Sequence, residues 1–226
     1  MKRTYTIIKP QQMKNLTKKG WMLFLGISLF LPVVAFAVLQ WYNNKVTSLP
    51  YYGENYQVAS KPPFHTVQRF EFLNQDSALT DSRFTDGKIW VAHFFYTSCP
   101  VICPRMMNGM SEISKAYAGN ESVRLVSLTV DPYHDTPSLL KDYALAKNIR
   151  NQQWQLLTGA KPDLYRYARK ALFITATDGD GGPGDFIHSD KLVLVDRANH
   201  IRGYYDGTEK SEVQLLINDI KRLLDE

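Results

Sequence analysis

Two closely spaced cysteines, Cys99 and Cys103, are the residues of this chain best suited to chemistry. A thiolate is both a nucleophile and a ligand for soft metal ions, so a close pair suits either disulfide exchange or metal binding. A purely structural disulfide between them would close a very short loop and stabilise the fold little, because this stabilisation grows with loop length. Dithiol enzymes more commonly use C-x-x-C, so the wider C-x-x-x-C spacing leaves redox and metal chemistry open.

The spacing also determines where the two sulfurs lie. If Cys103 is in the first turn of a helix, the four-residue separation places both sulfurs on one face, close enough to hold a single ion. Two thiolates and one further ligand suit Cu(I), and nitrogen or oxygen donors complete a site for Cu(II). A metal site at this pair would therefore require a third ligand from elsewhere in the chain.

The five histidines are the natural candidates for that ligand. His93 lies inside an apolar run, where we expect a core histidine and not a ligand. His65 is at the entrance of the main folded domain and His200 is in a hairpin connection, so we expect both at the surface. His134 lies in a loop after an expected strand and could approach the cysteines. His188 has a different setting, which depends on the surrounding elements.

Apolar runs and helical periodicities alternate along the region that must position these residues. Strands are expected where apolar and β-branched residues gather, at 88–96, 124–130, 154–157, 191–195 and 201–205. Helices are expected at 104–117, 136–147, 162–172 and 209–224. The order β-α-β-α-β-α-β-β-α indicates an α/β fold, a mixed sheet with helices on both faces. Because the paired cysteines lie between the first buried strand and its helix, the arrangement is thioredoxin-like.

In such a fold His188 is the strongest candidate for the third ligand. It follows a glycine-rich loop at residues 178–184 and directly precedes the strand at 191–195. Thioredoxin-like folds bring this part of the chain against the paired cysteines, and dithiol enzymes commonly place a cis-proline turn there. This chain has Phe186-Ile187-His188-Ser189 instead. An imidazole in that place favours metal binding over disulfide exchange.

The N-terminal region differs in composition from the rest of the chain. The net charge is +5, and residues 1–19 contribute +6, so the remainder carries −1. The basic residues therefore belong to an N-terminal tail and not to a nucleic-acid-binding face, and we expect no nucleic-acid partner. Residues 20–42 contain no charged residue and are long enough to cross a bilayer as one helix. The basic tail predicts a cytoplasmic N-terminus.

These features divide the chain into four expected parts. They are a cytoplasmic tail (1–20), a transmembrane anchor (21–42), a tether (43–63) and a thioredoxin-like copper-binding domain (64–226). The alternative to an anchor is a cleaved signal peptide, since Ala35-Phe36-Ala37 resembles a cleavage site. The apolar run is longer than a signal peptide requires and continues past Ala37, which favours a retained anchor. The domain is exported in both cases, whether the segment is an anchor or a signal peptide. We expect a single-pass protein of the cell inner membrane with its domain on the periplasmic side.

Three segments together resemble the Sco/SenC family of membrane-tethered copper proteins. They are FFYTSCPVICPRM (94–106), LTVDPYHDTP (128–137) and FIHSDKLVLVD (186–196). The resemblance covers essentially the whole exported domain and implies a thioredoxin-like fold that binds copper through Cys99, Cys103 and His188. It also implies delivery of copper to the dinuclear copper site of a haem-copper cytochrome oxidase, or reduction of the thiols of that site. The implied partners are the oxidase subunit that carries this site and other copper chaperones.

The chain departs from the family pattern near the cysteines. Many members carry an acidic residue after each Cys-Pro pair, where this chain has Val101 and Arg105. His134 also occupies a variable position of the aspartate-rich segment. These differences make the surroundings of the cysteines more basic and apolar, which bears on partner identity more than on metal binding.

Several other residues carry groups that could take part in a metal site. Met106, Met107 and Met110 carry soft thioether donors, but their spacing is typical of core packing on a helix. Asp131 could approach the site as an outer group or simply end its strand in an Asp-Pro turn. The segment Asp178–Asp185 has some calcium-loop features but lacks the glutamate and the flanking helices of such a loop, so we expect no calcium site.

A copper chaperone and not a turnover enzyme is therefore the expected function. The alternative is a thiol-disulfide reductase that acts on the cysteines of exported partners without carrying metal. A peroxiredoxin-like peroxidase is disfavoured because the P-x-x-x-T-x-x-C context of such enzymes is absent around Cys99.

Overall fold

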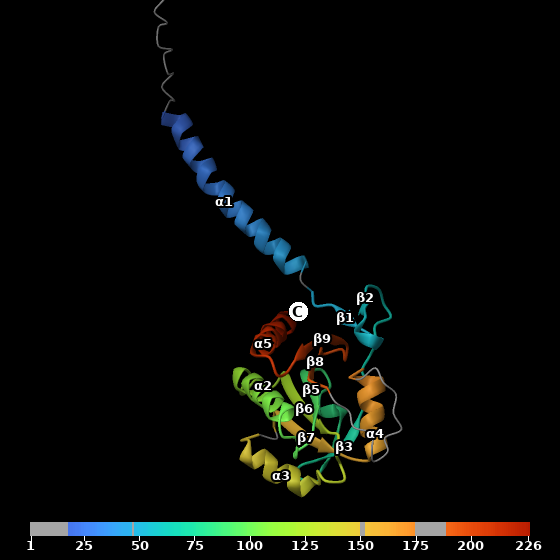
Figure 1. The fold of residues 1–226 in the computed structure, drawn as a ribbon. Helices are drawn as coiled ribbons and strands as arrows, with labels where there is room; N and C mark the ends of the chain where they lie inside the picture. The colour runs from blue at the N-terminus through green and yellow to red at the C-terminus, as the bar shows by residue number, and fades with distance from the viewer. Residues whose placement is uncertain (1–17, 47, 150–151, 175–188) are drawn as a thin grey trace, which may run out of the picture. The chain divides into compact units, whose positions relative to one another are not determined.

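A computed structural model describes residues 18–46, 48–149, 152–174 and 189–226 of the chain (Figure 1). The chain divides into two compact units, residues 1–48 and residues 49–226. The second unit contains the two cysteines.

The first unit contains one long helix, α1 (Lys18–Val46). Its segment Gly20–Gln40 has a mean hydropathy of 2.6 and is long and apolar enough to cross a membrane, judged by length and composition. The large apolar side chains from Trp21 to Leu39 are exposed, as expected of a helix that faces lipid and not a protein core. Pro32 lies inside the helix without ending it.

The second unit is built on a seven-stranded sheet with the order β4-β3-β7-β6-β5-β8-β9. The three central strands β5, β6 and β7 are parallel, and the strands on either side of them pair antiparallel. The seven strands are β3 (Glu71–Asn74), β4 (Leu79–Asp81), β5 (Ile89–Phe95), β6 (Val123–Thr129), β7 (Trp154–Thr158), β8 (Lys191–Val195) and β9 (Ile201–Asp206).

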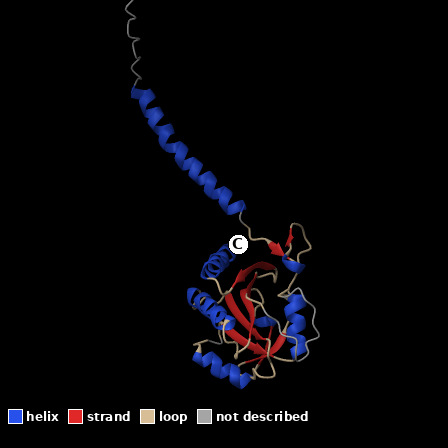
Figure 2. Ribbon diagram, in the orientation of Figure 1, coloured by secondary structure: helices blue, strands red, loops and turns tan. Residues whose placement is uncertain are grey.

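Helices cover both faces of this sheet (Figures 1 and 2). One face carries α2 (Ile102–Ala116), α3 (Pro137–Ala146) and α5 (Lys210–Asp225), and the other carries α4 (Lys161–Arg166) with its π-helical continuation η3 (Tyr167–Ala171). The expected mixed sheet with helices on both faces is confirmed. The single helix expected at 162–172 differs in detail, because its second half is the π-helical turn.

Strand β5 lies at the centre and explains the two-faced core. All seven of its residues are buried. Ile89, Val91 and Phe95 pack into the cluster under α2, α3 and α5, while Trp90 and Phe94 pack into the cluster under α4. A strand buried on both faces needs a nearly continuous apolar run, which is why this strand is so apparent in the sequence.

Helix α2 lies close to the turn that follows β9. A side-chain carbon added at Gly109 would come within 2.9 Å of a Val213 methyl group and 3.0 Å of the Gly207 carbonyl oxygen. Glycine at this position therefore allows α2 to approach α5 closely, and this approach sets the position of the helix that begins at the cysteines.

The segment expected to be a tether contains regular structure. Strands β1 (Tyr51–Tyr52) and β2 (Val58–Ala59) form a small antiparallel sheet, with the 3-10 turn η1 (Glu54–Tyr56) between them. A second 3-10 turn, η2 (Ser82–Phe84), follows β4. Leu49 is buried in the core of the second unit, which runs from Leu49 to Glu226.

A buried arginine holds the segment that contains Leu49 and Tyr51 to the last strand of the domain. Arg202 on β9 is 2% exposed and donates to the Leu49 carbonyl oxygen at 2.8 Å. It also pairs with Asp196 at 3.0 Å and with Glu226 at 3.1 Å, and its guanidinium lies 4.3 Å from the centre of the Tyr51 ring. The start and the end of the domain are therefore joined through one cation.

Candidate metal centre

The two cysteines lie where β5 passes into α2. The chain leaves β5 at Phe95, and the Cys99 N–H donates to the Tyr96 carbonyl oxygen at 3.3 Å. Helix α2 begins at Ile102, two residues before the expected start, so Cys103 lies in its first turn. The Cys103 N–H donates to the Cys99 sulfur at 3.3 Å. The sulfur that precedes the helix therefore accepts one of the free N–H groups of its first turn, which favours a thiolate there.

The two thiols have different surroundings. Both are free, Cys99 is half-buried, and Cys103 is 6% exposed and packs with Met106, Met107 and Phe95 in the core under α2. Cys99 is thus the more accessible thiol of the pair, and Cys103 is the buried one.

The pKa values of the two thiols move in opposite directions. Burial acts to raise the pKa of Cys99, but hydrogen bonds to its sulfur outweigh it and hold the pKa below its ordinary value. The donors are the Cys103 thiol, the N–H groups of Cys103 and Val101, and the Tyr96 hydroxyl. Burial, followed by the hydrogen bond to Cys99, raises the pKa of Cys103 to about 12. Without metal, the pair therefore carries its negative charge on Cys99.

A buried carboxylate fixes the loop that leads to the cysteines. Asp135 is fully buried and accepts a hydrogen bond from the Thr97 N–H at 3.1 Å and another from the Thr97 hydroxyl. It also accepts one from the hydroxyl of Thr129 at the end of β6. Two of these donors are on Thr97, which follows β5, and the third is on Thr129, at the end of β6. Asp135 therefore joins the loop that carries the cysteines to the loop that follows β6.

His134 and Asp131 both lie close to the cysteine loop. The Nδ1 atom of His134 lies 3.0 Å from the Asp135 carboxylate and 3.4 Å from the Thr97 hydroxyl, two residues before Cys99. Asp131 is near enough to Tyr96 to contribute to the raised pKa of that phenol, of which the hydrogen bond to Cys99 is the main cause. Sequence reasoning named Asp131 and missed Asp135, because the two aspartates share one loop and only the tertiary structure shows which of them faces inward.

Three other histidines, His93, His65 and His200, contact groups other than the two cysteines. His93 is fully buried in β5, and its Nε2 lies 2.6 Å from the Ser127 hydroxyl, so its expected place in the core is confirmed. His65 contacts the Ala171 carbonyl oxygen at 2.8 Å, and His200 contacts Asp196 at 3.6 Å. Both are half-buried rather than at the open surface that the sequence suggested.

The three methionines after the pair are core residues. Met106, Met107 and Met110 are at most 2% exposed and pack against the sheet beneath α2. The expectation of core packing is confirmed, and their thioethers form part of the apolar surroundings that raise the pKa of Cys103.

The structure does not test the third ligand. His188 and the segment Asp178–Asp185 lie outside the described residues. Within the described part of the chain, no group of three His, Cys, Asp or Glu side chains is arranged to hold a metal ion. Cys99 and Cys103 thus form two thirds of the predicted site, and His188 stays a prediction.

The surface beside Cys99 is apolar. Val101 is 62% exposed in the cysteine loop, Ile102 is 45% exposed at the start of α2, and Tyr133 is 74% exposed in the loop after β6. Arg105, the basic residue after the second Cys-Pro pair, contacts the Glu209 carboxylate at 3.3 Å and the Thr208 carbonyl oxygen. Its charge is therefore partly compensated, and the exposed apolar side chains are the more distinctive feature of this rim.

This arrangement can support two kinds of chemistry. One half-exposed sulfur with a lowered pKa beside a buried thiol suits attack on a disulfide, with the second thiol closing the new bond. The same two sulfurs, held on one side of a helix start, suit a soft metal ion that displaces both protons.

Comparison with known proteins identifies the family. The sequence model of the SCO1/SenC family matches residues 58–225. A SCO1 protein homolog of Bacillus subtilis is 30% identical over 167 residues, which cover 73% of this chain and 86% of that protein.

Two solved structures share the fold. One is BsSco, described as a cytochrome c oxidase assembly protein with a disulfide switch; it is 29% identical, with a TM-score of 0.60, over 73% of this chain and 96% of that one. Bradyrhizobium japonicum ScoI with copper bound is 22% identical, with a TM-score of 0.56, over 70% of this chain and 99% of that one. The expected thioredoxin-like fold is thereby confirmed. The chain belongs to the SCO1/SenC family.

Proposed function

We propose that this protein is a membrane-anchored copper chaperone that carries copper on Cys99 and Cys103. The observation that carries the proposal is the pair of free thiols at the start of α2, joined by the Cys103 N–H and the Cys99 sulfur. Two thiolates that approach one point form a donor set for a soft ion, and Cu(I) is the soft ion that such a set selects best. The copper-bound ScoI structure, which has the same fold, supports this choice.

His188 is the proposed third ligand. Its place before β8 in the sequence supports this, because β8 pairs with β5, the strand that leads to Cys99. Neutral imidazole is a common ligand of copper and would complete a three-ligand set that leaves the cargo exchangeable. The glycine-rich segment before His188 would allow the ligand to move onto and off the ion.

The proposed recipient is the subunit of a haem-copper cytochrome oxidase that carries the dinuclear copper site, with other copper chaperones as donors. The description of BsSco as a cytochrome c oxidase assembly protein supports this assignment. The apolar span of α1 and the basic tail before it support a single-pass anchor in the cell inner membrane with the domain outside the cytoplasm. Copper would then be presented on the side where such an oxidase exposes its copper site.

The second candidate function is thiol-disulfide reduction of the recipient. The opposite shifts of the two thiol pKa values favour it, because a thiolate on Cys99 can attack a partner disulfide and Cys103 can then close the intramolecular bond. In that step two thiols of this chain are oxidised to one disulfide, and one partner disulfide is reduced to two thiols. The relative described with a disulfide switch is consistent with both functions, since oxidation would also abolish copper binding.

Substitution of His188 separates the two candidate functions. The full-length protein in non-ionic detergent is reduced and titrated with Cu(I) against a competing chelator, as wild type, His188→Ala and His200→Ala. We expect His188→Ala to weaken Cu(I) binding by at least about tenfold, because it removes a ligand, whereas His200→Ala leaves it unchanged. The disulfide between Cys99 and Cys103 should still form in all three proteins.

Two results would count against the copper assignment. Equal Cu(I) affinity in wild type and His188→Ala would exclude His188 as a ligand. If the reduced wild type bound no copper yet reduced a disulfide-bonded partner peptide, the chain would be a reductase and not a copper carrier.

A further inference from the structure

A broad groove lies at the end of the central strands that is opposite the cysteines. Its volume is about 1340 Å³, and it is lined where β5, β6 and β7 begin and where α2 and α3 end. Cys99 follows the other end of β5, so the groove and the candidate metal centre lie at opposite ends of the parallel strands. Nothing in the proposed copper chemistry uses this groove.

The charge of the lining is strongly one-sided. Five basic residues line the groove against Glu121, the one acid of the lining among the described residues; they are Arg83, Lys88, Lys115, Arg124 and Lys147. The surrounding domain has the opposite balance: the net charge of the chain is +5, and residues 1–48 contain seven Lys or Arg and no acid, so residues 49–226 carry −2. The groove is therefore a positive region on a negative domain.

Ordinary structural roles explain only part of this charge. Arg83 pairs with Asp81 at 2.7 Å, and Lys115 and Lys147 lie at the ends of α2 and α3, where the helix dipole favours cations. The dipoles do not account for Lys88 before β5 or for Arg124 on β6. A concave surface that gathers cations from four elements concentrates positive potential, and such a surface attracts an anionic partner.

The floor of the groove is fixed by hydrogen bonds. The Gln153 side-chain amide donates to the Tyr117 carbonyl oxygen at 2.7 Å, and its oxygen accepts from the Ser114 hydroxyl at 3.2 Å. Arg124 lies 5.5 Å from the centre of the Phe84 ring. These contacts hold the lining in place without a ligand, so a partner would meet a preformed surface.

Size and lining point to a polypeptide and not to a small anion. The volume exceeds the roughly 300–1,000 Å³ of typical small-molecule sites. The wall beside the cations also carries apolar side chains, with Leu145 69% exposed and Ile149 half-buried. A phosphate ion would leave that wall uncovered, whereas an extended peptide can place carboxylates on the lysines and its other side chains against Leu145 and Ile149.

We propose that this groove docks an acidic segment of a partner protein at the end of the sheet opposite Cys99. Docking there would hold a partner to the chaperone while the cysteine end of the same domain stays free to exchange copper or thiols. The site would act through charge, so binding should weaken as ionic strength rises.

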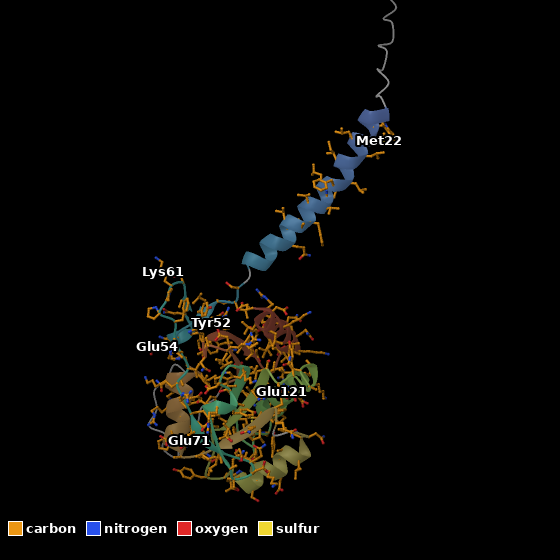
Figure 3. The ribbon with its side chains drawn as sticks, turned by 180° about the vertical axis from the view of Figure 1, so that it is seen from behind. Met22, Tyr52, Glu54, Lys61, Glu71 and Glu121 are labelled. Carbon is orange, nitrogen blue, oxygen red and sulfur yellow. The ribbon has the colours of Figure 1, made fainter. Side chains whose placement is uncertain are left out.

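Fluorescence anisotropy with a defined probe tests the proposal. The probe is a fluorescein-labelled ten-residue peptide of alternating glutamate and alanine, added to the full-length protein in non-ionic detergent at low salt. The groove variant combines Lys88→Glu, Lys115→Glu and Lys147→Glu. The matched control combines Lys61→Glu, Lys210→Glu and Lys221→Glu, which changes the net charge equally on exposed lysines outside the groove. Lys61 and Glu121 are labelled in Figure 3 on separate parts of the domain.

We expect the groove variant to bind the probe at least about tenfold more weakly than wild type, and the control variant to lose less than about threefold. Replacing the same three lysines by arginine should retain binding. Alkylation of Cys99 should be unchanged in all variants, so failure here is distinguishable from failure of the copper site. Three results would overturn the proposal. They are no binding of the probe to wild type, an equal loss of binding in both charge variants, and displacement of the probe by inorganic phosphate at the same total charge.

Discussion

The environment of each sulfur determines how the cysteine pair behaves. Cys99 accepts hydrogen bonds from the Cys103 N–H and from the Tyr96 hydroxyl, while Cys103 lies in the core beside Met107. The first environment stabilises a thiolate and the second opposes one. The pair is therefore divided into an outer reactive thiol and an inner thiol that loses its proton readily only when a metal or a disulfide replaces it.

Alkylation measures this division directly. In the reduced protein we expect iodoacetamide to modify Cys99 well before Cys103. The rate of Cys99 modification should rise with pH and then level off. It should level off at a lower pH than the rate for a free cysteine, because the pKa of Cys99 is lowered. Tyr96→Phe should shift that profile to higher pH by removing one donor to the sulfur. Mass spectrometry of the modified peptide identifies the thiol, and modification of Cys103 first would contradict the account.

His93 is a second residue whose surroundings set its charge. It is fully buried on β5, its Nε2 contacts the Ser127 hydroxyl, and its Nδ1 has no hydrogen-bond partner among the described residues. Burial lowers its pKa from 6.5 to about 3. The folded protein therefore keeps this imidazole neutral, whereas the unfolded chain takes up a proton near pH 6.5.

Stability should depend on pH accordingly. Above pH 6.5 neither state protonates His93, so it contributes no pH dependence there. As the pH falls from 6.5 towards 3 only the unfolded state takes up the proton, and the free energy of unfolding falls. Between pH 7 and pH 5 this contribution is about 2 kcal/mol. Urea unfolding of wild type and His93→Gln at both pH values measures it, and an equal pH dependence in the two proteins would exclude His93 as its source.

At the scale of the elements, α2 and the loop after β6 are what place the cysteines. Helix α2 begins at Ile102 and is held close to α5 by the absence of a side chain at Gly109. Asp135 joins Thr97, before the cysteines, to Thr129 at the end of β6. The position of Cys99 is therefore set by two neighbouring strands and one helix, and not by the loop alone.

Arg202 sets the other structural junction, between the start of the domain and its last strand. Arg202→Met leaves buried carboxylate and carbonyl groups without their partner, so we expect a loss of about 3–5 kcal/mol in the free energy of unfolding. The segment around Tyr51 should also become sensitive to limited proteolysis. The control Arg69→Met removes an exposed pair with Asp86 and should cost less than about 1 kcal/mol. Equal losses in the two variants would show that the buried junction has no special role.

The sequence predicts the strands and helices that have a clear hydrophobic pattern of their own. Strand β5 is buried on both faces and therefore has a continuous apolar run. Helices α2 and α5 bury one face each and therefore have an amphipathic pattern. Strands β1 and β4 are only two and three residues long, and their pairing partners create them, so no local pattern announces them. The cysteine pair followed from spacing alone, whereas the role of Asp135 depends on contacts across two loops.

At the scale of the whole molecule, one apolar helix precedes a domain that begins immediately after it. Helix α1 ends at Val46, and Leu49 is already buried in the core of the second unit. The apolar span of α1 is consistent with the proposed membrane anchor.

The orientation of the chain is testable in intact cells. With the outer membrane removed, added protease should digest residues 49–226 and leave an N-terminal epitope tag intact, because the basic tail is expected on the cytoplasmic side. The protein should also stay in the membrane fraction at alkaline pH. A protected domain would contradict the expected sidedness, and release of the domain without protease would indicate cleavage after α1.

The central claim is that Cys99 and Cys103 bind copper together, and absorption spectroscopy tests it most directly. The reduced full-length protein is titrated with Cu(II), beside Cys99→Ser and Cys103→Ser. We predict a thiolate-to-copper charge-transfer band that saturates at one equivalent in wild type and is lost in both variants. A wild-type spectrum without this band, or a band that survives in either variant, would contradict copper binding by the pair.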